Sequence, residues 1–380
     1  MEQRIITAKD NFIELDQWLV RNNCRKVLMV CDGSVQYIKA FNAHLKEIES
    51  KGTSIIQFRD FQPNPLYESV VEGVSWFRDK GCDSIIAVGG GSAMDVAKCI
   101  KLYSNMQGNG ENGDYLSQDS VPNCIPFMAM PTTAGTGSEA TRYAVIYFNG
   151  EKQSVTSESI IPETVLIYPA ALTTLPPYQK KATMMDALCH ALESFWSVNS
   201  TEASKACSHK AMRLVMKHMD GYLANTDEGN EGMLRAAHIA GQAINITQTT
   251  AGHAMCYKIT SLFQVAHGHA AILCNRVLFP WMIENTDRCI DKRGEQYLRT
   301  VYKQIATAMD CRDAGEAARK LNDMYGNLNL EIPGATTEQF EVLKDSVNPV
   351  RLKNFPIALD AKTIDDLYHE ILREKKRESK

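Results

Sequence analysis

The sequence predicts an α/β domain with a parallel sheet, followed by an all-helical domain. In the first half of the chain, short β-branched runs alternate with helical patterns, and this alternation is typical of a parallel sheet covered by helices. In the second half, long helical patterns follow one another without a convincing strand. Leu175-Pro176-Pro177 marks the joint, because proline ends regular elements and forces extended geometry on the preceding residue. The predicted domains are therefore residues 1–176 and 177–380.

The predicted elements follow from the spacing of apolar residues. Short apolar runs predict strands at residues 26–31, 54–58, 84–88, 126–130 and 164–168. Helical spacing lies between several of these strands, at residues 65–80 and 93–103. Four longer segments of the second half show the same helical spacing: 180–198, 201–224, 232–247 and 287–308.

Composition excludes several classes of protein. The chain is 44% hydrophobic and 23% charged, which is ordinary for a soluble globular protein. Its 45 acidic and 41 basic residues give a formal charge of −4, which is unfavourable to a nucleic-acid partner. The 11 cysteines contain no Cys-x-x-Cys pair, so they fit free thiols of a reducing cytoplasm better than a disulfide framework. We expect neither a secretion signal nor a membrane span, since no long apolar run is present.

A glycine-rich turn joins the predicted strand 84–88 to the predicted helix 93–103. The turn consists of Gly89, Gly90, Gly91 and Ser92. Glycines let the backbone approach a phosphate closely, and the first amides of the following helix point at that phosphate. The turn departs from the G-x-G-x-x-G pattern, because Met94 occupies the position of the third glycine. It predicts a phosphate site, with an ordinary tight turn as the alternative.

Polar residues follow two other predicted strands. The loop 131–139 is rich in threonine and glycine, and it lies where ligands bind in an open α/β sheet. Asp32 follows the strand 26–31, where a carboxylate bonds the adenosine ribose and repels a 2′-phosphate, which favours NAD over NADP. However, Asp32 precedes the glycine turn instead of following it. A structural loop and a turn aspartate before Gly33 are the alternatives.

Four residues of the helical half carry atoms that bind metals. Asp186 and His190 are four residues apart, which places both on one face of a helix that is otherwise apolar there. His253 and His267 would stand about 21 Å apart on one straight helix, so a shared metal requires a break or bend within 260–266. Three histidines and one carboxylate suit Fe(II) or Zn(II), which acts as a Lewis acid. Taken singly, each residue has a structural role as its alternative.

These motifs, in this order, resemble the iron-containing alcohol dehydrogenase family. The resemblance rests on Gly89 to Asp95, on Pro131 to Glu139, on Asp186 with His190 and on His253 with His267, and it spans about residues 26–354. It implies a dinucleotide domain, a helical metal-binding domain, an active site between them and a homo-oligomeric assembly. It also implies one divalent ion, Fe(II) or Zn(II), on Asp186, His190, His253 and His267.

The resemblance further implies that NAD(P) is the cofactor, and Asp32 favours NAD(H). Its pyrophosphate would lie on the glycine turn, with further contacts from the threonine-rich loop and from the loop that contains Asn64. Together with Asp32, the cofactor-binding residues predicted on this basis are Asn64, Gly89, Gly90, Gly91, Ser92, Asp95, Thr132, Thr133, Thr136 and Thr141.

The sequence departs from the family pattern in three places. Many members carry a second histidine four residues after the ligand that His253 matches, often assigned to a proton relay; here the residue is Tyr257. Tyr257 is therefore a candidate for the relay, beside a cofactor ribose hydroxyl and water. A common Asp-Pro pair is Tyr168-Pro169. Arg142 and Tyr143 stand where many members have small or neutral residues lining the substrate pocket.

The last departure predicts a substrate class. Arg142 and Lys258 flank elements that the resemblance places near the metal, and a cation in an apolar pocket selects an anion. Residues 252–261 are also similar to the branch that includes phosphonoacetaldehyde and sulfoacetaldehyde reductases. The sequence therefore predicts NADH-dependent reduction of a small anionic aldehyde, with Arg142, Tyr143 and Lys258 binding the substrate. A solvated or ion-paired side chain is the alternative for each cation.

Three other functions stay open at this point. A reductase of the same family for lactaldehyde, propanal or butanal would need no cation in its pocket. A dehydroquinate-synthase-like lyase also combines NAD with a metal, and a nucleotide-binding regulator would need no chemistry. The complete ligand set favours the alcohol dehydrogenases over these last two.

Overall fold

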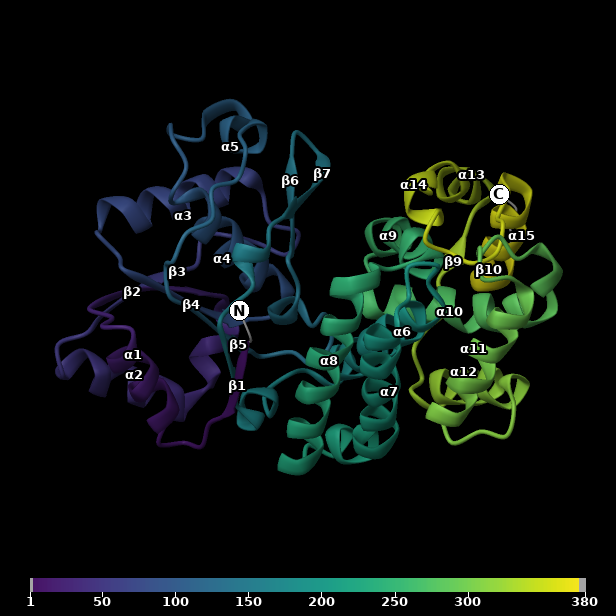
Figure 1. Ribbon diagram of the computed structural model, residues 1–380, viewed down its shortest axis with the longest axis horizontal. Helices are drawn as coiled ribbons and strands as arrows, with labels where there is room; N and C mark the ends of the chain where they lie inside the picture. Colours follow the sequence, from purple (N-terminus) through teal and green to yellow (C-terminus); the bar gives the residue numbers. More distant parts are fainter. Residues whose placement is uncertain (1–2, 376–380) are drawn as a thin grey trace, which may run out of the picture. The chain divides into compact units, whose positions relative to one another are not determined.

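The computed structural model describes residues 3–375, which form two compact units (Figure 1). The first unit ends at Leu175 and also includes Ala224–His238, and the second comprises Pro176–Leu223 and the described chain from Ile239 onward. The main joint therefore lies at Leu175-Pro176, but the segment 224–238 belongs to the first unit. Among the contacts that join this segment to the first unit, Arg235 donates a hydrogen bond to Thr7 over 2.8 Å.

A six-stranded parallel sheet forms the centre of the first unit, which confirms the predicted fold class. Its strands, in order across the sheet, are β1 (Arg4–Thr7), β8 (Thr164–Ile167), β5 (Phe127–Pro131), β4 (Ser84–Gly89), β2 (Lys26–Cys31) and β3 (Ser54–Phe58). All of these except β1 were expected from the sequence. Strand β1 is a short, partly exposed edge strand, so its apolar pattern is weak.

Helices cover both faces of this sheet. One face packs against α3 (Tyr67–Asp79) and α4 (Gly91–Tyr103), and the other against α1 (Ile13–Arg21) and α2 (Lys39–Ser50). In β4, Ile85 and Ala87 belong to the first of these two cores, whereas Ile86 and Val88 belong to the second. Because side chains alternate between the faces of a strand, a sheet covered on both faces requires continuous apolar runs. This requirement explains why the central strands were visible in the sequence.

An antiparallel hairpin adjoins the main sheet of the first unit. It consists of β6 (Tyr143–Phe148) and β7 (Glu151–Thr156), joined at Asn149 and Gly150, which both have positive φ. This hairpin was not predicted from the sequence, although an Asn-Gly pair is a strong signal for such a turn.

The second unit is helical, as expected. Its helices are α6 (Pro177–Trp196), α7 (Glu202–Leu223), the later part of α8 (Asp227–Thr247), α9 (Ala251–Phe263), α10 (His267–Glu284), α11 (Glu295–Ala308), α12 (Ala314–Asn327), α13 (Thr337–Asp345), α14 (Pro349–Leu352) and α15 (Ala361–Ile371). In the described part of this unit, strands are limited to the short pair β9 (Gly334–Ala335) and β10 (Arg373–Glu374). Helix α11 begins later than predicted, because Gly294 at its N-cap has a φ of 85°.

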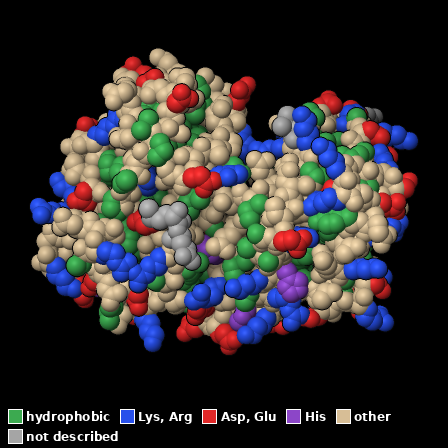
Figure 2. Space-filling model, viewed as in Figure 1, with side chains coloured by type: hydrophobic (Ala, Val, Ile, Leu, Met, Phe, Trp, Pro, Cys, Tyr) green, Lys and Arg blue, Asp and Glu red, His purple; other side chains and the backbone are tan. Residues whose placement is uncertain are grey.

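The surface carries both charges. On the face shown in Figure 2, basic and acidic side chains are interspersed, in keeping with the small net charge of −4. Across residues 3–375, every helix is too short or too polar to cross a bilayer.

Candidate active site

Three polar segments meet at the carboxyl edge of the central sheet. Asp32 directly follows β2, Gly89 ends β4, and Thr132 directly follows β5; these three strands are neighbours. The amide of Thr132 donates a hydrogen bond to the carbonyl of Gly89 over 3.0 Å, so the two loops are joined at their first residues. The structure therefore brings the glycine turn, the threonine-rich loop and Asp32 to one edge, where open α/β sheets bind ligands.

The glycine turn is crowded on the side of the threonine-rich loop. A Cβ atom at Gly90 would lie 3.2 Å from Thr133 Cγ2, and one at Gly91 would lie 3.0 Å from Thr136 Cγ2. Gly90 caps α4, which begins at Gly91, so the first amides of this helix lie in the turn. A helix N-terminus behind glycines that approach a second loop closely is a geometry that suits a dinucleotide pyrophosphate.

Lys98 stabilises the threonine-rich loop through hydrogen bonds. The side chain is buried, and its Nζ donates hydrogen bonds to Ser138 Oγ (3.0 Å), Thr141 Oγ1 (3.1 Å) and the carbonyl of Tyr143 (2.8 Å). Burial lowers the pKa of Lys98 to about 8, although the charges of Asp95 and Glu139 oppose this shift. Lys98 was not among the residues predicted for this site.

The predicted cofactor residues differ in how the structure uses them. Asp95 accepts hydrogen bonds from Ser138 Oγ (2.7 Å) and from the amide of Val145 (3.0 Å), so its carboxylate positions the loop. Asn64 is exposed in the loop after β3, with a φ of 59°. Asp32 Oδ1 accepts a hydrogen bond from the amide of Ser34 over 2.8 Å and caps the turn that follows, which is the alternative role considered for it.

The candidate metal centre lies in the second unit, where three helices supply the four predicted ligands. Asp186 and His190 lie one turn apart on α6, His253 lies on α9, and His267 is the first residue of α10. Helix α9 ends at Phe263, and Gln264 adopts a left-handed conformation with a φ of 54°. This break confirms the bend expected within 260–266, and it is what lets both histidines reach one site.

The distances between the ligand atoms fit a single ion. Atoms of Asp186, His253 and His267 all lie within 4.8 Å of one another. Asp186 Oδ1 is 3.4 Å from His253 Nε2 and 3.9 Å from His190 Nε2. Ligands of a tetrahedral zinc ion at about 2.1 Å stand about 3.4 Å from one another. The group of Asp186, His253 and His267 therefore suits a divalent transition metal, and His190 lies beside it on the side of Asp186.

A buried carboxylate that was not predicted from the sequence lies behind this centre. Glu193 Oε1 is 2.6 Å from His253 Nδ1 and accepts a hydrogen bond from Asn275 over 2.8 Å, while Glu193 Oε2 accepts one from the Thr250 hydroxyl over 2.9 Å. A signal existed in the sequence, because Glu193 lies seven residues after Asp186 on the same stripe of α6. The carboxylate keeps the proton of His253 on Nδ1 and leaves Nε2 free to bind a metal.

The electrostatics of the centre favour a cation. Burial alone would raise the pKa of Glu193, but the charge of His253 and the hydrogen bonds from His253, Asn275 and Thr250 lower it to about 2. Burial opposes protonation of His253, yet Glu193 and Asp186 raise its pKa to about 9. Asp186 Oδ1 and His253 Nε2, 3.4 Å apart, are both acceptors when His253 is neutral, so a proton or a metal ion must lie between them.

Tyr257 lies beside the fourth ligand, but its hydroxyl has another partner. Its ring stacks on that of His267, with centroids 5.5 Å apart, and its Oη accepts a hydrogen bond from Arg351 over 3.0 Å. Burial raises the pKa of Tyr257 above its ordinary value of 10, and Arg351 offsets this only in part. Since a general acid works best with a pKa near the operating pH, these features disfavour Tyr257 as the proton relay.

The predicted substrate residues have protein partners of their own. Arg142 forms an ion pair with Glu158 at 2.7 Å and donates to the hydroxyl of Tyr143 at 3.1 Å. Lys258 is half-buried on α9. Five residues after His253, it points about 140° away from that ligand around the helix. None of these contacts places a free cation at the metal centre.

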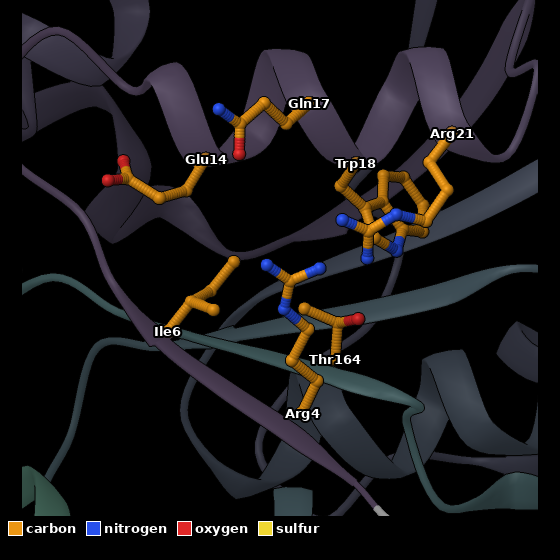
Figure 3. Close-up of a pocket in the computed structure, with 7 residues that line it drawn as sticks. All are labelled: Arg4, Ile6, Glu14, Gln17, Trp18, Arg21 and Thr164. Atoms are coloured by element: carbon orange, nitrogen blue, oxygen red, sulfur yellow. The ribbon is translucent and has the colours of Figure 1, made fainter.

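Two cavities of the first unit lie away from these residues. Figure 3 shows one between α1 and the strands β1 and β8, and its volume of about 10 Å³ suits no more than a water molecule. The other, of about 560 Å³, lies among residues 122–126 and 157–163, which precede β5 and β8. This second cavity is therefore at the amino ends of the strands, opposite the edge where such sheets bind nucleotides.

Comparison with known families identifies the fold. The family model described as iron-containing alcohol dehydrogenase matches residues 2–169, and the model for the C-terminal part of the same family matches residues 180–372. The chain belongs to the iron-containing alcohol dehydrogenase family. It is accordingly an enzyme of the NAD-dependent alcohol dehydrogenase and aldehyde reductase type.

Named relatives of this dehydrogenase act on different small alcohols and aldehydes. It is 32% identical to the NAD-dependent methanol dehydrogenase of Bacillus methanolicus over 86% of this chain and 84% of that protein. It is 30% identical to the 1,3-propanediol dehydrogenase of Citrobacter freundii over 70% of each chain. The crystal structure of sulfoacetaldehyde reductase from Bifidobacterium kashiwanohense in complex with NAD+ superimposes with a TM-score of 0.85 at 26% identity, covering 97% of this chain and 96% of that one.

Proposed function

We propose that this dehydrogenase reduces small anionic aldehydes to primary alcohols, with NADH and one divalent metal ion, Fe(II) or Zn(II). The observation that carries the proposal is the meeting of Asp186, His253 and His267, whose ligand atoms lie within 4.8 Å of one another, with His190 adjacent. When bound, the ion supplies a Lewis acid for the carbonyl oxygen and NADH supplies the hydride.

The protein's own residues prepare the metal centre. Asp186, His190, His253 and His267 hold the ion, and Glu193 fixes the ring of His253 through Nδ1 at 2.6 Å. Complete burial of Glu193 keeps water from competing for this hydrogen bond. The site is thereby preorganised for an ion that keeps one position for substrate.

The cofactor assignment rests on the edge of the sheet. The turn of Gly89, Gly90, Gly91 and Ser92 holds the pyrophosphate, while Thr132, Thr133 and Thr136 line it from the neighbouring loop. Asp95 and Thr141 keep that loop in place through Ser138 and Lys98. Asp32 offers its second carboxylate oxygen to the adenosine ribose, which favours NADH over NADPH.

Two substrate classes compete, and each has an observation in its favour. The structural neighbour named as a sulfoacetaldehyde reductase supports an aldehyde that bears a strong acid, either sulfonate or phosphonate. The pairing of Arg142 with Glu158 favours a neutral aldehyde such as propanal or lactaldehyde, because it neutralises one of the two cations predicted for the pocket. We place the anionic class first, because a different arginine, Arg351, donates a hydrogen bond to Tyr257, whose ring stacks on that of His267.

The test is an assay of NADH oxidation on protein stripped of metal with a chelator and reloaded with Fe(II) or Zn(II). We expect turnover only after reloading, and a higher kcat/KM for sulfoacetaldehyde or phosphonoacetaldehyde than for propanal. Elemental analysis of His253→Ala should show loss of the metal, whereas His44→Gln, which changes a buried histidine of the first unit, should keep it. Absence of turnover with every aldehyde, or metal retained in His253→Ala, contradicts the proposal.

A further inference from the structure

A cation from a remote part of the sequence lies beside the metal centre. Arg351 lies on α14, and its guanidinium stands 4.9 Å from the ring centroid of Tyr257 while one of its nitrogens donates to the Tyr257 hydroxyl over 3.0 Å. The same tyrosine ring stacks on that of His267, with centroids 5.5 Å apart. Arg351 and the candidate metal ligand His267 therefore both contact the side chain of Tyr257.

Arg351 differs from the paired arginines in having no counter-charge. Within the described part of the chain, no carboxylate forms an ion pair with it, and Tyr257 is its side-chain hydrogen-bond partner. Other arginines pair with carboxylates at 2.6–3.1 Å, for example Arg142 with Glu158, Arg288 with Asp360 and Arg293 with Asp291. A half-buried guanidinium without an acidic partner is costly unless it meets an anion.

The segment that carries Arg351 is hydrogen-bonded to the residues that directly precede α9. Asn354 donates hydrogen bonds to the carbonyl of Thr249 and to Gln248 Oε1, both at 3.2 Å, and accepts one from Asn199 over 2.9 Å. Thr249 lies four residues before His253. The position of the guanidinium is therefore tied to the same helix that presents His253 and Tyr257.

We infer that Arg351 binds the acid group of the substrate, a sulfonate or phosphonate whose aldehyde carbon lies at the metal centre. The inference rests on the proposed function and names the residue that selects its substrate. A guanidinium has five N–H donors, and the bond to Tyr257 uses one of them. The remaining donors can form a bidentate hydrogen bond with a tetrahedral oxyanion. Arg351 takes the role predicted from the sequence for Arg142 and Lys258. Arg142 is paired with Glu158, and Lys258 points away from the face of α9 that carries His253.

The contact of both Arg351 and His267 with one aromatic ring limits the length of the substrate. Because the guanidinium and the candidate ligand share this neighbour, the acid group must lie close to the carbonyl carbon. A two-carbon aldehyde with a sulfonate or phosphonate on its second carbon satisfies this condition. A long-chain aldehyde presents no group for the guanidinium and leaves its charge unpaired.

The test compares the holoenzyme with Arg351→Gln, Arg351→Lys and Lys353→Gln, using sulfoacetaldehyde, phosphonoacetaldehyde and propanal with NADH. The measured quantity is the ratio of kcat/KM for each charged aldehyde to that for propanal. We expect Arg351→Gln to lower this ratio about 10- to 150-fold, chiefly through KM, since a hydrogen bond to a charged group is lost. Arg351→Lys keeps the charge but loses the planar guanidinium, so its ratio should lie between those of the wild type and Arg351→Gln. Lys353→Gln changes an exposed cation of the same segment and should leave the ratio unchanged.

A binding measurement separates failure of this inference from failure of the proposed function. Calorimetry with ethanesulfonate, which cannot be reduced, should show binding to the wild type and to Lys353→Gln but weaker binding to Arg351→Gln. Equal losses of kcat/KM for charged and neutral aldehydes in Arg351→Gln, with unchanged ethanesulfonate binding, overturn the inference and leave the proposed function in place. If the wild type reduces no aldehyde, the proposed function fails, and the calorimetry alone then decides whether Arg351 is an oxyanion site.

Discussion

Glu193 Oε1 and His253 Nδ1 lie 2.6 Å apart in the interior of the second unit. The pair orients an imidazole whose other nitrogen faces Asp186 Oδ1 at 3.4 Å. A carboxylate behind a metal-binding histidine fixes the tautomer and raises the basicity of the ligand. The proposed metal centre therefore depends on a residue that need not touch the metal.

The first prediction concerns Glu193→Gln. The amide keeps the size of the side chain but removes the negative charge that faces His253, so we expect metal affinity to fall about 10- to 100-fold. Competition with a chromophoric chelator measures this affinity directly. Glu139→Gln is the matched control, because Glu139 is a buried carboxylate 3.4 Å from His238 in the first unit. Equal affinity in the wild type and Glu193→Gln would show that the pair serves packing alone.

The second prediction concerns Gly268, the residue after His267. A Cβ atom at Gly268 would meet the carbonyl oxygen of Ala182 and would lie 2.6 Å from Asp186 Cβ. Gly268→Ala therefore pushes α10 away from α6, and we expect it to cost about 1–3 kcal/mol of unfolding free energy. The shift also separates His267 from Asp186, so metal content should fall in elemental analysis.

Gly326→Ala on α12 is the control for this substitution. A Cβ atom at Gly326 would meet no other atom within 4 Å. Alanine is favoured over glycine within helices by about 0.5–1 kcal/mol, so this variant should be as stable as the wild type or slightly more so. If both variants behave alike, the close approach of α10 to α6 is not what fixes the metal centre.

The third prediction concerns cofactor choice. Asp32→Asn keeps an oxygen that can cap the turn at Ser34 but removes the charge that repels a 2′-phosphate. We expect the ratio of kcat/KM for NADH to that for NADPH to fall, with little change in thermal stability. A wild-type enzyme that prefers NADPH, or a variant with the same ratio, contradicts the role given to Asp32.

The fourth prediction concerns pH. The pKa of Lys98 is lowered from 10.5 to about 8 by burial, so between these values the unfolded chain binds more protons than the folded chain. Protonated Lys98 is thus a cost that is fully present below pH 8 and is relieved as the pH rises. The free energy of unfolding should rise through this window by up to about 1.4 kcal/mol per pH unit from this group.

Urea unfolding of the wild type and Lys98→Met at pH 8, 9 and 10 measures this contribution. The unfolding free energy of the wild type should increase relative to that of Lys98→Met as the pH rises. Lys303→Met, which changes an exposed lysine on α11, should follow the slope of the wild type. A difference between the wild type and Lys98→Met that stays constant over the three pH values contradicts the prediction.

Local patterns in the sequence determined the strands of the central sheet, the glycine turn and part of the candidate metal site. The strands β2, β3, β4, β5 and β8 were predictable because burial on both faces requires continuous apolar runs. The glycine turn before α4 was visible because a close approach of two loops admits no side chain at Gly90 and Gly91. The pairing of Asp186 with His190 followed from the helical repeat. The break after Phe263 followed from the expectation that His253 and His267 share a metal, because one straight helix would place them about 21 Å apart.

Only the tertiary structure decided which of the charged side chains meet. Arg351 and Tyr257 are 94 residues apart in the chain, and Glu193 and His253 are 60 apart, so no local periodicity relates them. The same limit explains why Arg142 was assigned to the substrate, since its partner Glu158 lies on a separate turn after β7. Periodicity records which face of an element is buried, but the partner of a buried or half-buried charge is set by packing between elements. The fold was therefore readable from the sequence, whereas the residue that we expect to select the substrate was not.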